Sequence, residues 1–183
     1  MSRVFTVGHG TRTTEELTTI LLTAGVGLLI DVRRFPGSRR HPHFSRESLE
    51  RSMPERGIRY EWWGEDLGGR RSRSTKATRH VAWRNAGFQG YADYMDTDRF
   101  GAALARLEKA ARTEPPLAIM CAERLWWRCH RRLISDALHL RGVEVIHLIA
   151  LDESQPHKPH PDMRPDELGR PVYDVGATGR LEL

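Results

Sequence analysis

The chain of 183 residues is 39% hydrophobic, which is enough to bury one sizeable core and gives no reason to expect two. Its formal net charge of +5 favours an anionic partner. The sequence has no signal-peptide pattern and no apolar run of membrane-spanning length, and its only cysteines are Cys121 and Cys129. We therefore expect a cytoplasmic protein that does not enter a membrane and that keeps its cysteines reduced.

The first residues of the chain follow a strand, helix, strand pattern. Arg3 to Val7 predicts a strand, and the capping box from Thr13 to Glu16 begins a helix that ends at Gly25. The segment Val26 to Val32 is almost continuously apolar, as in a strand that is buried on both faces of its sheet. These elements predict a βαβ unit with parallel strands.

The remaining elements continue this alternation. A short helix from Ser45 to Arg56 and a strand from Ile58 to Trp62 precede the segment Gly64 to Gly87, which lacks periodicity and predicts a long loop. The sequence then predicts helices near 91–95 and 98–112, a strand at 117–121, a helix at 127–140 and a strand at 143–151. The expected fold is a single α/β domain, with a mostly parallel sheet and helices on both faces in a Rossmann-like three-layer arrangement.

Residues 1–151 are expected to form this domain, and residues 152–183 a tail. The tail is rich in proline and contains His157 and His160, so it should be extended or disordered unless it wraps the domain. Within the domain, residues 8–12, 31–40 and 121–124 directly follow predicted strands. Ligands bind beyond the carboxyl ends of strands in open parallel sheets, so these loops predict one functional edge.

Several ordered motifs occur along the chain. They are Thr6 to Arg12, Ile30 to Arg33 followed by Phe35 to Arg40, Leu67 to Gly69, Tyr91 to Met95, and Met120 to Glu123 followed by Cys129 to Arg131. This combination resembles the DUF488 family, a domain family of unknown function, from about Val4 to Ile149. The resemblance assigns no reaction, and it does not extend to the arginine-rich stretch 70–84 or to the tail.

Cys121 is the first candidate for a catalytic residue. At a strand end, near a helix N-terminus and several arginines, its thiolate would be stabilised and reactive. The alternative is a buried structural cysteine. Ile30 to Arg33 also resembles a strand of the rhodanese-like sulfurtransferases, but the Cys-x5-Arg loop of that family is missing, because Trp127 stands where its arginine would fall.

Glu123 offers a different chemistry. Together with Asp31 it would place two carboxylates at neighbouring strand ends, one as nucleophile or base and the other as acid. Alternatively, one of the two forms a structural ion pair with Arg33, Arg12 or Arg131.

The two histidines near this edge, His9 and His130, are expected to have different roles. His9 lies between two glycines and is expected to be exposed, as an acid, a base or a phosphate contact, or else to hydrogen bond to Asp31. His130 is expected inside a helix, in a packing role. A zinc site of Cys121, Cys129, His130 and His9 lacks a closely spaced cysteine pair, so we expect no metal, and no cofactor is indicated.

Arginine-rich segments predict the ligand contacts, because the guanidinium group suits bidentate contact with phosphate. The residues expected to bind the ligand are Thr11, Arg12, Arg33, Ser38, Arg39, Arg40, Arg124 and Arg131. The alternative is that such charge runs are solvated loops. The five tryptophans interleave with arginines, a composition typical of surfaces that stack bases.

The leading hypothesis is an enzyme that acts on a phosphate-bearing ligand, a nucleotide or a nucleic acid, at the carboxyl edge of the sheet. Cys121 or Glu123 would be its reactive centre, with His9 and Asp31 assisting. One alternative is a non-catalytic nucleic-acid binding module, in which the arginines and tryptophans suffice. A second alternative is a rhodanese-like sulfur carrier with a persulfide on Cys121.

Overall fold

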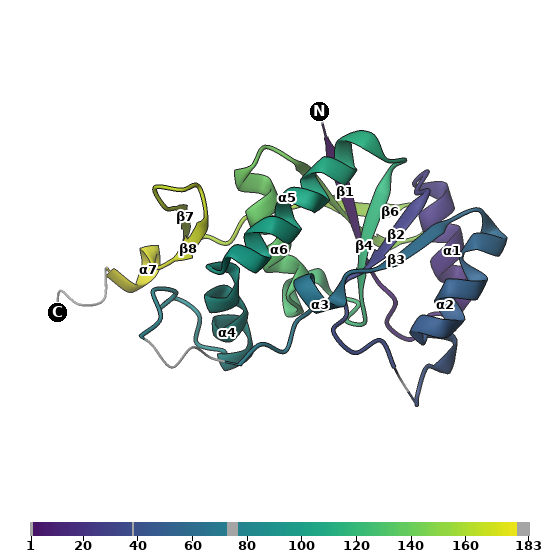
Figure 1. The fold of residues 1–183 in the computed structure, drawn as a ribbon, viewed down its shortest axis with the longest axis horizontal. Coiled ribbons are helices and arrows are strands. Elements are labelled where there is room, and N and C mark those ends of the chain that lie inside the picture. The colour runs from purple at the N-terminus through teal and green to yellow at the C-terminus, as the bar shows by residue number, and fades with distance from the viewer. Residues whose placement is uncertain (1, 38, 73–76, 179–183) are drawn as a thin grey trace.

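The computed structural model describes residues 2–37, 39–72 and 77–178. Its main sheet has six strands in the order β3-β2-β4-β1-β5-β6, with β6 antiparallel to β5 and all other neighbours parallel (Figure 1). The first two ligand loops expected from the sequence follow β1 and β2, and the third follows β4, which lies between them. The strands are β1 (Arg3–Gly8), β2 (Leu28–Asp31), β3 (Arg59–Trp62), β4 (Leu117–Cys121), β5 (Glu144–Ala150) and β6 (Glu153–Pro156).

Helices cover both faces of this sheet. α1 (Thr14–Thr23) and α2 (Arg46–Ser52) pack on one face, where Leu17 and Leu49 share a buried cluster with Met120. α4 (Ala86–Met95), α5 (Asp98–Thr113) and α6 (Arg131–Leu140) pack on the other face. The predicted fold class, a three-layer α/β domain with a mostly parallel sheet, is therefore confirmed. In the described part of the chain, no helix combines the length and apolar character needed to cross a bilayer.

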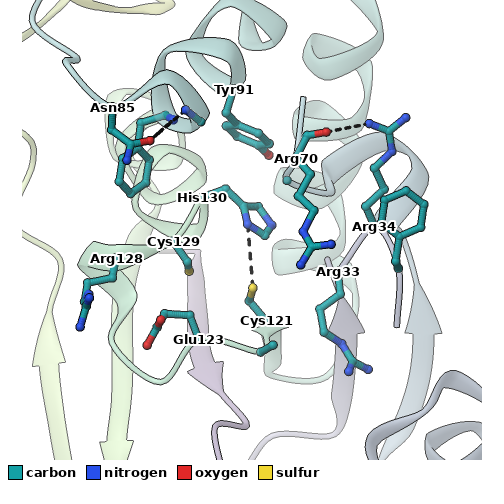
Figure 2. Close-up of a pocket in the computed structure, with 15 residues that line it drawn as sticks. Arg33, Arg34, Arg70, Asn85, Tyr91, Cys121, Glu123, Arg128, Cys129 and His130 are labelled. Atoms are coloured by element: carbon teal, nitrogen blue, oxygen red, sulfur yellow. Dashed lines mark hydrogen bonds between the residues drawn. The ribbon is translucent and has the colours of Figure 1, made fainter. Parts of the chain in front are cut away.

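The alternation of side chains along β4 sets the direction of Cys121. Met120 points towards α1 and α2, whereas Ile119 and Cys121 belong to the cluster beneath α5 and α6. Cys121 is the last residue of the strand, so its sulfur emerges on that face at the carboxyl end of the sheet (Figure 2). Successive side chains of a strand point to opposite faces, and strand length therefore decides on which side the thiol lies.

Two segments differ from the predicted elements. The helix expected at 127–140 begins only at Arg131, after a 3-10 turn, η3 (Trp126–Arg128), in which Trp126 stacks on His147 with ring centroids 4.0 Å apart. His130 therefore stands at the N-cap position, without a side-chain capping hydrogen bond, instead of lying inside the helix. The long loop expected at Gly64 to Gly87 contains α3 (Gly64–Leu67) and the start of α4, which the Asn85 side chain caps by accepting from two backbone amides.

The described part of the tail, residues 152–178, is folded against the domain rather than extended away from it. After β6, it contains the hairpin β7 (Met163–Pro165) and β8 (Pro171–Tyr173) and the short α7 (Val175–Thr178). Tyr173 is fully buried and donates to Asp136 of α6 at 2.9 Å, and the His157 ring bridges Asp136 and His147 at 2.9 and 3.0 Å. The wrapped arrangement foreseen as one option is therefore the one observed.

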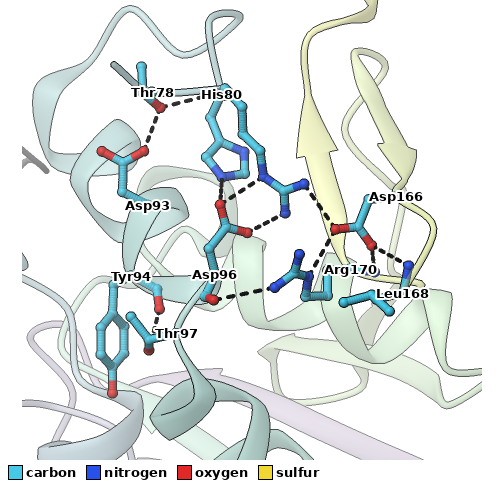
Figure 3. A network of polar contacts seen from close by, with 10 residues as sticks. Thr78, His80, Asp93, Tyr94, Asp96, Thr97, Asp166, Leu168 and Arg170 are labelled. Atoms are coloured by element: carbon cyan, nitrogen blue, oxygen red, sulfur yellow. Dashed lines mark hydrogen bonds and ion pairs between the residues drawn. The ribbon is translucent and has the colours of Figure 1, made fainter. Parts of the chain in front are cut away.

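An ionic network joins the tail to the segment before α4 (Figure 3). Arg79 donates to Asp96 at the end of α4 and to Asp166 in the β7–β8 turn, and Arg170 donates to the same Asp166 at 2.9 Å. Although burial acts in the opposite direction, His80 and Arg79 lower the pKa of Asp96 to about 2. Arg79, in the arginine-rich stretch, thus has a structural partner.

Candidate functional site

A cavity of about 460 Å³ opens at the carboxyl ends of β2 and β4, on the α4 and α6 side of the sheet (Figure 2). Both cysteines lie in its wall, next to the loops that follow these strands. Its lining comprises Arg33, Arg34 and Phe35 after β2, Gly69 and Arg70 after α3, Asn85, Gly87, Phe88 and Tyr91 at α4, and Cys121, Ala122, Glu123, Arg128, Cys129 and His130.

Cys121 and His130 face each other in this cavity. The Sγ atom of Cys121 lies 3.9 Å from Nδ1 of His130 (Figure 2), and the opposite ring nitrogen, Nε2, donates to the Val32 carbonyl at 3.0 Å. In the neutral ring, this bond leaves Nδ1 as an acceptor directed at the sulfur. Burial lowers the pKa of His130 and keeps the ring neutral, so His130 is a base next to a thiol.

The surroundings of Cys121 favour its thiolate. The adjacent Cys129 thiol, the charge of Arg131 and the backbone amides of Glu123 and Ala122 lower the pKa of Cys121 to about 6, against the effect of burial. Burial and the neighbouring Cys121 instead raise the pKa of Cys129, which remains a protonated donor. The surroundings therefore favour the thiolate at Cys121 and the protonated thiol at Cys129.

Arg131 supports this pair from beneath the cavity. It is 1% exposed, and its Nε donates to Cys129 Sγ at 3.2 Å. The other guanidinium nitrogens donate to Thr6 Oγ1 and to the carbonyls of Glu123 and Arg124. Arg131, expected from the sequence to bind phosphate, instead holds the loop after β4 and polarises the cysteine pair.

Gly69 gives His130 the room that it needs. A Cβ atom at this position would come within 2.8 Å of His130 Nδ1, the atom that faces Cys121. Gly8 is constrained in a similar way, because a Cβ there would lie 2.0 Å from the Glu123 carbonyl oxygen. These glycines allow the loops after β1, β4 and α3 to approach one another closely.

Asp31 and His9 form a separate buried group beside the cavity. Arg33 donates to both carboxylate oxygens of Asp31, and the Tyr60 hydroxyl donates to the same group at 2.7 Å. Of the two carboxylates expected to act together, Glu123 lines the cavity, whereas Asp31 is 0% exposed and is not in its lining.

His9 is buried, so the prediction that it is exposed is wrong. Its ring stacks on Phe44 with centroids 4.3 Å apart, its Nε2 lies 3.2 Å from Arg33 Nη1, and only 3% of the residue is exposed. Burial, followed by the charge of Arg33, lowers the pKa of His9 to about 4. The flanking glycines serve close packing of backbone segments here rather than the approach of a ligand.

The other residues expected to bind phosphate lie apart from the cavity or are partnered. Arg12 is half-buried and donates to the carbonyls of Gly8 and Ile149. Ser38 lies outside the described residues. Thr11, Arg39, Arg40 and Arg124 are exposed and do not line the cavity.

Of the arginines expected to bind the ligand, only Arg33 is in the cavity lining, and three further arginines join it there. Arg34, Arg70 and Arg128 are in its lining, and Arg34 also donates to the Arg70 carbonyl at 3.0 Å. Arg70 and Arg128 are exposed, so their charge faces solvent at the cavity mouth. The sequence contains a signal for two of these residues. Arg34 lies in the loop after β2, and Arg70 directly follows the Gly68-Gly69 motif.

Cys121, Cys129 and His130 also form a set of donors that can hold a metal ion. Their two sulfurs and one ring nitrogen lie within 4.8 Å of one another. Zinc binds thiolates and imidazole, and three protein ligands beside an open cavity are typical of catalytic zinc sites. The group found among the described residues does not include His9, which the sequence had placed with these three.

Fold and cavity together define an α/β domain with a Cys-His pair at the carboxyl edge of a parallel sheet. The sequence profile of the family described as Domain of unknown function DUF488 matches residues 13–138, more than half of the chain. The chain therefore belongs to the DUF488 family, and the matched range contains Cys121, Cys129 and His130. No curated protein and no solved structure matched the chain.

Proposed function

We propose that the protein is a thiol-dependent enzyme that acts on a phosphate-bearing substrate of the nucleotide or nucleic-acid class, with Cys121 as the nucleophile. The observation that carries this proposal is the placement of the Cys121 sulfur in the cavity, 3.9 Å from the acceptor nitrogen of His130. A nucleophile, an adjacent base and a group that orients the base are the parts that covalent catalysis requires. The Val32 carbonyl is the orienting group here.

The proposed reaction has two stages. The Cys129 thiol and Arg131 stabilise the Cys121 thiolate before attack. The thiolate then attacks an electrophilic centre of the substrate, and the bond to Cys121 forms as the bond between that centre and its leaving group breaks, after which the leaving group takes a proton from solvent. Nδ1 of His130 then takes a proton from a water molecule, which attacks the intermediate and releases Cys121. Glu123, also in the lining, supplies a second acid-base group at the same edge.

Charge and aromatic groups at the mouth support a phosphate-bearing substrate. Arg34, Arg70 and Arg128 supply positive charge around the opening, and guanidinium groups contact phosphate in a bidentate manner. Phe35 in the same lining is 64% exposed, with the Arg34 guanidinium 5.5 Å from its ring centroid, and so offers an exposed aromatic ring to a nucleobase. By contrast, Trp63, Trp83 and Trp126 are buried, which weakens the case for a non-catalytic binding surface built from tryptophans.

A rhodanese-like sulfur carrier is the second candidate. The backbone amides of Ala122 and Glu123 interact with the Cys121 sulfur, and such amides also stabilise a persulfide anion. A sulfur carrier would gain one sulfur atom on Cys121 after incubation with thiosulfate, which intact-mass measurement detects. The hydrolytic reaction proposed above predicts no such stable adduct.

Protection of Cys121 from alkylation tests the proposed substrate class. Cys121 is labelled with iodoacetamide at pH 7 in the presence of inorganic phosphate, nucleoside mono- and triphosphates, or short single-stranded RNA, and is followed by peptide mapping. We expect one nucleotide-bearing probe to slow labelling by about tenfold or more when it occupies the cavity. The double variant Arg70→Ser, Arg128→Ser should lose this protection.

Arg39→Ser, Arg40→Ser is the matched control, because both arginines are exposed and lie outside the cavity lining. It removes the same charge and should keep the protection. Equal loss in both double variants would assign the effect to net charge alone and contradict a substrate site in this cavity. Unchanged labelling with every probe would contradict the phosphate-bearing class.

A further inference from the structure

The two cysteines occupy positions that suit a bond between them. Cys121 ends β4 and Cys129 lies just before α6, and their sulfurs and His130 Nδ1 all lie within 4.8 Å of one another. Both are free thiols in this structure. The connecting segment includes the exposed residues Ala122, Arg124, Trp127 and Arg128, whereas Trp126 within it is buried against His147. A disulfide needs the sulfurs at about 2.0 Å, which requires a modest approach of this loop.

Both sulfurs are also reachable by small reagents. Cys121 and Cys129 are each 8% exposed, and both are in the wall of the 460 Å³ cavity. The two sulfurs have different neighbours, because Cys121 Sγ lies 3.9 Å from His130 Nδ1, whereas Cys129 Sγ accepts from Nε of the buried Arg131 at 3.2 Å. A thiolate that reacts first and a neighbouring thiol that resolves the product are the parts of a redox-active pair.

We propose that Cys121 and Cys129 form a reversible intramolecular disulfide in response to peroxide, and that this bond switches off the thiol site. The inference rests on the proposed function, because it requires a reactive Cys121. It adds a modification and a mode of regulation to that site. While the bond exists, Cys121 has no thiolate to attack a substrate.

The chemistry balances with peroxide as the oxidant. The Cys121 thiolate attacks one peroxide oxygen, the O–O bond breaks, and the departing hydroxide is protonated to water, which leaves a sulfenic acid on Cys121. The Cys129 sulfur then attacks the sulfenic sulfur, so that the S–O bond breaks as the S–S bond forms. The Cys129 proton passes through His130 Nδ1 to the departing hydroxide and gives a second water. The sulfurs lose two electrons, and peroxide gains them.

Oxidation of the full chain tests this proposal. The reduced wild-type protein is treated with an equimolar amount of hydrogen peroxide, then analysed by intact mass, thiol titration and peptide mapping under non-reducing conditions. We expect both thiols to be lost together, the mass to fall by two hydrogen atoms, and Cys121 and Cys129 to appear in one linked peptide. Dithiothreitol should restore both thiols.

Variants at Cys129 separate this proposal from the proposed function. Cys129→Ser, which keeps a hydroxyl donor, and Cys129→Ala should both accumulate the sulfenic acid of Cys121, trapped as a dimedone adduct, whereas the wild type should not. If the wild type also accumulates the adduct while Cys129 stays free, the disulfide is ruled out and the reactive thiol stands. A link between two chains, seen as a dimer on a non-reducing gel, also rules it out.

A Cys121 thiol that is inert to both peroxide and iodoacetamide in the folded wild type would overturn the disulfide and the proposed function together. Labelling of Cys121 with iodoacetamide therefore distinguishes a failure of the disulfide proposal alone from a failure of the proposed function.

Discussion

Asp31→Asn is expected to lower the free energy of unfolding by about 3–5 kcal/mol, as is typical when one partner of a buried ion pair is removed. Arg33 is only 6% exposed, and Asp31 is its anionic partner at 2.6 Å. Asparagine keeps the shape of the side chain but leaves the buried guanidinium without a counter-charge. It also weakens the acceptor of the Tyr60 hydroxyl. Urea denaturation at pH 7 measures the change.

Glu50→Gln is the matched control for Asp31→Asn. It removes the carboxylate of the Arg46 and Glu50 pair, whose side chains are 42% and 45% exposed. Exposed pairs of this kind contribute about 0.3–0.5 kcal/mol, so the control should be nearly as stable as the wild type. A similarly small decrease in the free energy of unfolding of both variants would show that the Asp31 and Arg33 pair does not stabilise this edge of the sheet.

The second large effect is expected for Arg131→Met. Methionine replaces the apolar stem but leaves the Glu123 and Arg124 carbonyls without their buried donor, at a cost of about 1–3 kcal/mol for each unsatisfied group. Loss of a nearby positive charge should also raise the pKa of Cys121 by about one pH unit or more. Urea denaturation and the pH dependence of Cys121 alkylation report the two effects separately.

Arg128→Met provides the comparison within the same cavity. Arg128 is exposed, so its removal should leave the free energy of unfolding within about 0.5 kcal/mol of the wild type. The pKa of Cys121 should also change less than in Arg131→Met. If the two variants behave alike in both measurements, Arg131 does not have the supporting role assigned to it.

Much of the fold was predictable because the hydrophobic pattern is regular. The apolar run that contains β2 and the capping box of α1 identified the first βαβ unit, and the bounds predicted for β4 agree with the structure. The strand ends then placed Cys121 and Glu123 at the carboxyl edge of the sheet, where both line the cavity. Local patterns of this kind are set by short-range contacts, which a sequence displays directly.

His130 was missed because a helix boundary was predicted too early. The apolar and charged residues from Trp127 onwards fit a helical period, but Trp126 packs on His147 of β5 and forms a 3-10 turn instead. This tertiary contact moves the helix start to Arg131 and turns the His130 ring towards Cys121. Contacts between distant segments decide such boundaries, and no local pattern reports them.

The arginines could not be sorted from the sequence for a similar reason. Arg131 donates to buried backbone carbonyls and Arg33 to the Asp31 carboxylate, although Arg33 also lines the cavity, whereas Arg34, Arg70 and Arg128 line it with less buried side chains. All five look alike in a charge pattern. Their roles depend on which buried acceptors lie within reach, and only the folded chain determines that.

The rate of Cys121 alkylation as a function of pH tests the central claim most directly. The folded wild-type protein is labelled with iodoacetamide between pH 4.5 and pH 9.5, and peptide mapping separates Cys121 from Cys129. The thiolate is the reactive form, so the rate should rise with pH through a midpoint near 6 and level off above it. A midpoint at or above about 8.5, the value of an unperturbed thiol, or an inert Cys121, would contradict a reactive thiolate at this site.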